Sequence, residues 1–345
     1  MTVSTRSKLE IRMPRRALVL LVAALPLLAG CGQGGSSAAP SVATVDLKVG
    51  LGYIPSVQFA PFYLAQQRGW YTAAGLHVTF ENKIDPDLVT LVGQGALDVG
   101  VADGTSVIPA VSQGIPIRYV ATIYGSFPSI VFAKASSGIT SAADLAGKRI
   151  GIPGKYGSSW IMLQALLQSV ALTPDDVTVV EYPDFGQGVA VQQGAVDAAT
   201  GFANNEPVTL GLTGEKAVVL HVDQVVALPG PGLIAGTKTL DSKAAAIRAF
   251  IAQTLRAMDA IAADPKTGLD ASIAAVPELA SDRDTQAAIL DATIDTWRDP
   301  TGAKPFGSID RAGWEASIAY LTKLQLVPNP VKADDLVRDD LLPAR

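Results

Sequence analysis

The sequence predicts an α/β protein of two lobes, and three observations lead to this fold class. Strand-like and helix-like segments alternate along most of the chain, which is the pattern of α/β folds. A segment at residues 92–99 returns in similar form at residues 191–198. About 315 of the 345 residues remain after an N-terminal leader, which is more than one ordinary core supports.

The strands and helices are expected in the following order. Apolar runs bounded by turn residues predict strands at 46–52, 76–81, 97–102, 117–123, 129–133, 149–153, 177–182 and 196–202. Helices are expected up to Gly69, from the pair Asp85 and Pro86, and over 160–170, with a capping box at 141–144. Beyond Asp241 the pattern becomes wholly helical, with helices at 247–262, 283–296 and 309–324.

The repeated segment indicates how the two lobes are related. In each copy a helix ends at a glycine, and an aspartate (Asp98 or Asp197) then leads into an apolar strand. Helix–glycine–strand connections are common in α/β proteins, so the similarity can also arise by chance. The more specific interpretation is that the chain has two lobes of similar build, and that a strand of each ends at a shared cleft. Open α/β sheets bind ligands at the carboxyl ends of their strands. We assign residues 46–131 and 232–345 to lobe one and 132–231 to lobe two, because the Pro229–Gly232 break favours a return crossing.

The N-terminal residues predict secretion and a lipid anchor. Five basic residues precede an apolar run at 17–29, which has the form of a signal peptide and is too short to span a bilayer as a helix. Cys31, the only cysteine of the chain, follows Leu-Ala-Gly as in a bacterial lipobox, although an ordinary thiol near a leader is the alternative. Residues 31–45 then form a Gly/Ser/Ala tether. We therefore expect residues 1–30 to be removed, Cys31 to be lipidated, and the protein to lie on the extracytoplasmic face of the cell membrane.

Composition excludes several classes of function. The part after residue 30 carries a net charge of −9, because the leader holds five basic residues and one acidic residue of a chain whose total is −5. Such a charge disfavours nucleic acid and anionic lipid as partners. The two histidines, His77 and His221, lie far apart, and neither a nucleophile elbow nor a zinc-protease motif is found. We expect no catalytic residues, no metal and no cofactor.

Aromatic residues make up only 6% of the chain, yet many fall in the predicted loops and strand ends. Stacking rings with a few polar groups suit a flat, mostly uncharged heterocycle, and these loops contain no arginine to grip a sulfonate or phosphate. As an alternative, half of these rings can belong to the core. The Gly-rich loop at 151–159 can likewise be a plain helix cap, with Ser158 and Ser159 starting the helix over 160–170. The predicted ligand-binding residues are Tyr53, Gln58, Phe59, Asp103, Thr105, Tyr124, Tyr156, Ser158, Trp160, Phe202, Asn204 and Glu206.

Several stretches together resemble a known family. Residues 51–65 (LGYIPSVQFAPFYLA), 69–76, 144–151 and 309–314 are similar to the NMT1/THI5-like substrate-binding lipoproteins of bacterial ABC importers. The resemblance spans residues 46–327 and implies a type II periplasmic-binding-protein fold, two α/β lobes joined by a two-strand hinge. It also implies a small-molecule ligand, an ABC permease as partner, and a monomer. Residues 57–63 and 201–207 look most like the riboflavin-binding branch and next like the branch that binds thiamine pyrimidine precursors; the alkanesulfonate branch is less similar.

Other functions remain open on the same fold. The fungal members that make the thiamine pyrimidine rely on a histidine and a cysteine-rich iron-binding segment, and this chain has no cysteine beyond Cys31. An enzyme of that type, an alkanesulfonate-binding protein and a sensor that signals without delivering ligand are the alternatives. A binding protein rather than an enzyme is the expectation.

Overall fold

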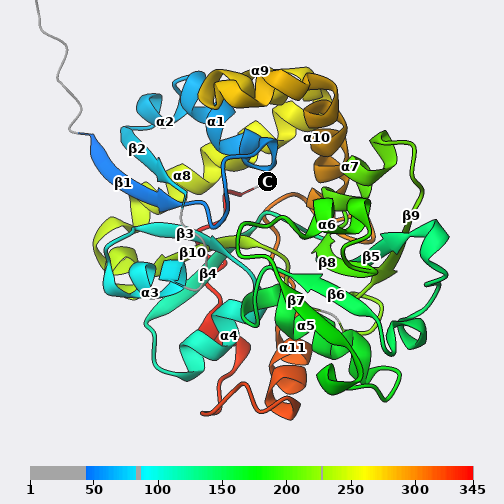
Figure 1. Cartoon of the computed structure of the whole chain (residues 1–345). Helices are drawn as coiled ribbons and strands as arrows, with labels where there is room; N and C mark the ends of the chain where they lie inside the picture. The colour runs from blue at the N-terminus through cyan, green and yellow to red at the C-terminus, as the bar shows by residue number, and fades with distance from the viewer. Residues whose placement is uncertain (1–43, 83–86, 227, 345) are drawn as a thin grey trace, which may run out of the picture. The chain divides into compact units, whose positions relative to one another are not determined.

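The computed structural model describes residues 44–82, 87–226 and 228–344, which form two five-stranded sheets surrounded by helices (Figure 1). The leader, Cys31 and the helix start at Asp85 and Pro86 lie outside the described residues. The α/β fold class is confirmed. All eight expected strands are present, and two more occur at 217–221 and 232–236.

The first sheet has the order β2-β1-β3-β10-β4. Strands β1 (Val45–Gly50), β2 (Leu76–Glu81) and β3 (Val99–Ala102) are parallel, whereas β10 (Gly232–Gly236) runs antiparallel between β3 and β4 (Ile117–Thr122). Every residue of β10 is buried, which explains its apolar sequence GLIAG.

The second sheet has the order β7-β6-β8-β5-β9. Strands β6 (Arg149–Ile152), β7 (Thr178–Glu181) and β8 (Ala198–Phe202) are parallel, and β5 (Ser129–Lys134) is antiparallel to both β8 and β9 (Ala217–His221). The chain passes from the first sheet to the second between β4 and β5 and returns between β9 and β10. The two sheets therefore share one pattern of strand directions and are joined by two crossings.

Helices follow most of the strands and form most of the described chain beyond β10. They are α1 (Ala60–Gln67), α2 (Trp70–Ala73), α3 (Asp87–Gln94), α4 (Gly104–Ser112), α5 (Gly157–Gln168), α6 (Gln187–Gln193), α7 (Glu206–Leu212), α8 (Thr237–Ala263), α9 (Pro265–Ala275), α10 (Arg283–Trp297), α11 (Arg311–Lys323) and α12 (Ala333–Leu336). Apolar side chains of α1, α8, α9 and α10 pack with β1 and β2 in one core cluster. A second cluster joins α4 and α11 to α5 and to strands of both sheets. The assignment of 46–131 with 232–345 and of 132–231 to separate lobes stays a prediction.

The repeated segment forms the same joint in both sheets. Asp98 accepts the backbone N–H of Lys48 on its Oδ2 at 2.9 Å and returns its own N–H to the Lys48 carbonyl at 2.9 Å. Asp197 does the same with Arg149, at 2.8 and 2.9 Å. The glycine three positions earlier has a φ of +79° in one copy and +73° in the other, a conformation that glycine adopts without strain. The joints fix where β3 and β8 start, and so where their carboxyl ends lie.

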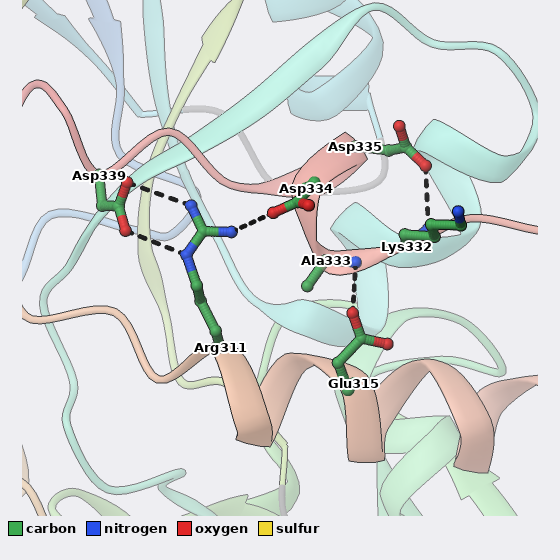
Figure 2. A network of polar contacts seen from close by, with 7 residues as sticks. All are labelled: Arg311, Glu315, Lys332, Ala333, Asp334, Asp335 and Asp339. Atoms are coloured by element: carbon green, nitrogen blue, oxygen red, sulfur yellow. Dashed lines mark hydrogen bonds and ion pairs between the residues drawn. The ribbon is translucent and has the colours of Figure 1, made fainter.

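A network of charged groups holds the C-terminal segment against α11 (Figure 2). The guanidinium of Arg311 binds both carboxylate oxygens of Asp339 at 3.1 Å and also contacts Asp334. Glu315 accepts the N–H of Ala333 at 2.9 Å. The paired guanidinium lowers the pKa of the Asp339 carboxyl below its usual range. These bonds keep the chain beyond α11 against that helix.

Candidate ligand-binding site

A cavity opens between the two sheets at the carboxyl ends of β1, β3, β6 and β8. The space between its walls is about 1040 Å³ with the open mouth included. The first sheet's side supplies Leu51, Gly52, Tyr53, Gln58, Phe59, Val101, Ala102 and Asp103, and the crossings supply Tyr124 and Pro231. The second sheet's side supplies Pro153, Tyr156, Gly157, Ser158, Ser159, Phe185, Gln187, Gly201, Phe202, Asn205 and Glu206.

Nine of the twelve predicted site residues line this cavity. They are Tyr53, Gln58, Phe59, Asp103, Tyr124, Tyr156, Ser158, Phe202 and Glu206. Their ligand contacts stay a prediction, but the structure does bring them together from five separate stretches of chain.

The other three predicted residues do not line the cavity. The Thr105 hydroxyl and N–H both donate to Oδ1 of Asp103, at 2.6 and 2.9 Å, so this side chain serves the start of α4. Trp160 lies one turn into α5, where it packs against the second core cluster. Asn204 is 1% exposed and sits behind the wall, bonded to other side chains. Each lies within two residues of a lining residue in sequence, but its own side chain points elsewhere.

Aromatic rings face the cavity from both sheets. Tyr53 and Phe185 meet edge to face across it, with ring centroids 5.0 Å apart and planes at 85°. The side chains of Phe62 and Phe127 belong to the core instead. Phe185 and Gln187 were missing from the predicted set. Phe185 lies in the loop before α6, and its ring lines the cavity. Its φ of +61° is uncommon for a residue with a side chain.

Helix α5 presents its first turn to the cavity. The expectation that Ser158 and Ser159 cap a helix starting at Trp160 is wrong, because α5 already begins at Gly157, whose φ is +60°. Both serines are therefore inside the first turn, and Tyr156 before them makes no side-chain cap. The first N–H groups of a helix have no partner within it, so they suit an oxygen of a ligand.

Glu206 is the first residue of α7 and folds back over the end of β8. Its Oε2 accepts the N–H of Phe202 at 2.8 Å. A Cβ on Gly201 would lie 2.7 Å from Oε2, so a larger residue there would force the carboxylate to shift. Burial raises the pKa of the Glu206 carboxyl to about 7, although the Phe202 N–H opposes this shift. Burial also raises the pKa of the Tyr53 phenol, and the Glu206 charge adds to that effect.

The charged groups around the cavity are acidic. Asp103 and Glu206 line it, and its described lining includes neither lysine nor arginine. Asp103 caps α4 through Oδ1, which also lies 3.3 Å from the N–H of Ser106. In the ranges 44–82, 87–226 and 228–344, no three His, Cys, Asp or Glu side chains gather as metal ligands. The two histidines instead pair with surface aspartates.

Solved structures show which fold this is. The periplasmic aliphatic sulphonate binding protein SsuA from Escherichia coli superposes with a TM-score of 0.64, covering 85% of this chain and 92% of that one at 17% identity. The expected periplasmic-binding-protein fold is confirmed. Among the described residues, no helix is long and apolar enough to cross a membrane.

Sequence relatives carry the names of both binders and enzymes. The riboflavin-binding protein RibY of Chloroflexus aurantiacus is 30% identical over 323 residues, 92% of this chain and 91% of that protein. The formylaminopyrimidine-binding protein of Halalkalibacterium halodurans is 24% identical over 92% of this chain and 96% of its own length. A 4-amino-5-hydroxymethyl-2-methylpyrimidine phosphate synthase of Legionella pneumophila is 30% identical over 49% of this chain and 52% of that enzyme. The profile described as NMT1/THI5 like matches residues 56–268, and the chain therefore belongs to the NMT1/THI5-like family.

Proposed function

We propose that this protein is the extracytoplasmic substrate-binding component of an ABC importer and captures a planar heterocycle, riboflavin first and a thiamine pyrimidine precursor second. The observation that carries this proposal is the lining of the cavity. Six aromatic side chains, from both sheets and one crossing, surround a space whose described charged groups are carboxylates. The relationship to RibY over 92% of the chain supports the choice of riboflavin.

The chemistry of a flavin fits the groups around the cavity. Its ring system stacks on aromatic side chains, each such contact contributing about 0.5–1.5 kcal/mol beyond burial. Its ribityl hydroxyls and ring N–H are donors that suit the carboxylates of Glu206 and Asp103. Its ring carbonyls are acceptors for the free N–H groups at the start of α5. A pyrimidine offers the same kinds of group on a smaller frame.

A fluorescence titration tests the ligand. Flavin emission should be quenched when the protein is added, because a ring stacked on tyrosine or tryptophan loses emission and three tyrosines line the cavity. At 100 times its dissociation constant the ligand should add about 2.7 kcal/mol to the free energy of unfolding, seen as a rise in melting temperature. Tight binding of taurine or another sulfonate, with no response to flavins or pyrimidines, would overturn the proposal.

An enzyme of the thiamine-pyrimidine type is the second candidate, because synthases are among the relatives. The described residues show no cluster of metal ligands that would support the iron-dependent chemistry of the fungal members. Incubation with riboflavin or a pyrimidine precursor, followed by mass spectrometry of the recovered small molecule, separates the two functions. A binding protein returns its ligand unchanged, and any protein-dependent product would favour the enzyme.

We also propose that the protein is a monomer anchored through a lipidated Cys31 beside its permease. Replacing Cys31 with alanine should leave the protein unlipidated, either uncleaved or released into the medium. Cell fractionation followed by mass spectrometry of the N-terminus checks this expectation. Normal processing and membrane retention of the Cys31→Ala variant would contradict it.

A further inference from the structure

We propose that Asn204 is a positioning residue that ties the two sides of the cavity together and thereby slows release of the ligand. The effect on release rests on the proposed capture function, whereas the bridge itself consists of three buried side chains. Asn204 follows β8 on the second sheet's side. Its partners, Gln58 and Thr293, belong to the first sheet's side, where Gln58 lies in the turn before α1 and Thr293 on α10.

The Asn204 amide bridges these two elements. Its Nδ2 donates to Oε1 of Gln58 at 3.1 Å and to Oγ1 of Thr293 at 2.8 Å. Asn204 is 1% exposed, Gln58 6% and Thr293 0%, so water does not readily replace these hydrogen bonds. Residues 146 and 89 positions apart in sequence are thus joined through one side chain.

The neighbouring bonds fix which way each group faces. The Thr293 hydroxyl donates its only proton to the carbonyl of Ile289 at 2.7 Å, so it must accept from Asn204. Both protons of Asn204 Nδ2 are therefore used. Oε1 of Gln58 accepts a second bond from the Tyr124 hydroxyl at 3.3 Å, which leaves Nε2 as the donor end of that amide.

Gln58 lines the cavity while Asn204 does not, so Asn204 acts on the ligand through Gln58. The Nε2 group of Gln58 donates to Ser56 Oγ at 3.3 Å and keeps a second proton for an acceptor atom of the ligand. Loss of the bridge frees the Gln58 amide to turn and removes bonds that form only while the two sides are together. A ligand held between those sides should then leave faster.

The test compares two threonine-to-valine variants. Thr293→Val removes one of the two acceptors that Asn204 binds, with little change in shape. Thr254→Val is the matched control: Thr254 is also 0% exposed and donates to a carbonyl one turn back (Phe250, 2.9 Å), but its other partner, Tyr71 at 2.8 Å, is on the same side of the cavity. Both variants lose two buried hydrogen bonds and should lose similar stability.

We expect Thr293→Val to release riboflavin about 5- to 10-fold faster in stopped-flow displacement, the effect of roughly one buried hydrogen bond, with an unchanged association rate. Thr254→Val should release it at the wild-type rate. Equal release rates in the two variants would overturn the proposal. If the wild-type protein binds no riboflavin, the proposed function has failed instead, and solution scattering without ligand decides the inference. A larger radius of gyration for Thr293→Val than for Thr254→Val supports the bridge, and equal radii overturn it.

Discussion

Replacing Trp314 with alanine is expected to lower the free energy of unfolding by about 3–5 kcal/mol, the range for removing a large buried aromatic side chain. Trp314 lies on α11 and is 1% exposed. Its ring meets that of Tyr119 on β4 edge to face, with centroids 4.8 Å apart. The Tyr119 hydroxyl in turn donates to the carbonyl of Gly230 in the return crossing at 2.9 Å. Loss of the indole would leave a void beneath both β4 and that crossing.

Urea denaturation of the Trp314→Ala variant measures this loss, with Trp70→Ala as the control. Trp70 is only partly buried, and its ring faces the guanidinium of Arg256 at 3.9 Å, a contact of about 0.5–1 kcal/mol at an exposed site. Since Trp314 does not line the cavity, riboflavin affinity should stay unchanged wherever the variant is folded. Equal destabilisation by the two substitutions would show that α11 is not a structural support of the first sheet.

The positions of the strands could be predicted from the sequence better than the pairing between them. All eight expected strands were found, because each is a short run rich in apolar residues. The two missed strands pair with distant segments: β10 lies between β3 and β4, and β9 pairs only with β5, at the edge of its sheet. The five residues of such a strand do not indicate which distant strand it pairs with.

The helix expected at 247–262 shows a similar limit. It begins ten residues earlier, at Thr237, and contains a kink at Lys243, where φ is −127°. The Lys243 ammonium there binds the carbonyl of Asp46 at 2.8 Å and the carboxylate of Asp98 at 2.9 Å. The pattern after the kink was regular enough to predict, whereas the turn before it depends on contacts with the first sheet.

Site residues could be predicted from strand ends but not from side-chain directions. Asp103 and Glu206 reach the cavity because each follows the carboxyl end of a strand, as the repeated segment indicated. Thr105 and Asn204 are equally close to those ends, yet one joins a helix cap and the other turns into the protein. Which way a side chain turns after a strand depends on partners such as Thr293, which come from the other end of the chain.

Glu206→Gln is expected to weaken riboflavin binding about 10- to 100-fold at pH 8, because a charge-assisted hydrogen bond contributes roughly 1.5–3 kcal/mol. The glutamine keeps an acceptor for the Phe202 N–H but carries no charge. The matched control is Glu215→Gln, which removes a carboxylate that pairs with Lys134 at 3.7 Å and does not line the cavity. That variant should bind riboflavin as the wild type does.

The pH dependence of binding follows from the raised pKa of Glu206, about 7. Ligand donors prefer the ionised carboxylate, so the proton competes with the ligand below pH 7. Wild-type affinity should therefore fall by up to tenfold per pH unit as the pH drops from 7 to 6. The glutamine variant does not titrate there, and the difference between the two proteins should shrink in the same interval. Titrations at pH 6, 7 and 8 measure both trends.

Stability should change with pH in the opposite direction, which separates the ligand role of Glu206 from a purely structural one. The folded protein holds the Glu206 proton up to about pH 7, whereas the unfolded chain releases it near pH 4.5. The contribution of this group to folding is therefore fully present below pH 4.5 and is lost as the pH rises to 7. The ligand-free Glu206→Gln variant should match the wild type at low pH and not melt below it at pH 8. If Glu206 only starts α7, where a carboxylate gains about 0.3–1 kcal/mol from the helix dipole, the substitution will instead lower the melting temperature and leave riboflavin affinity at its wild-type value.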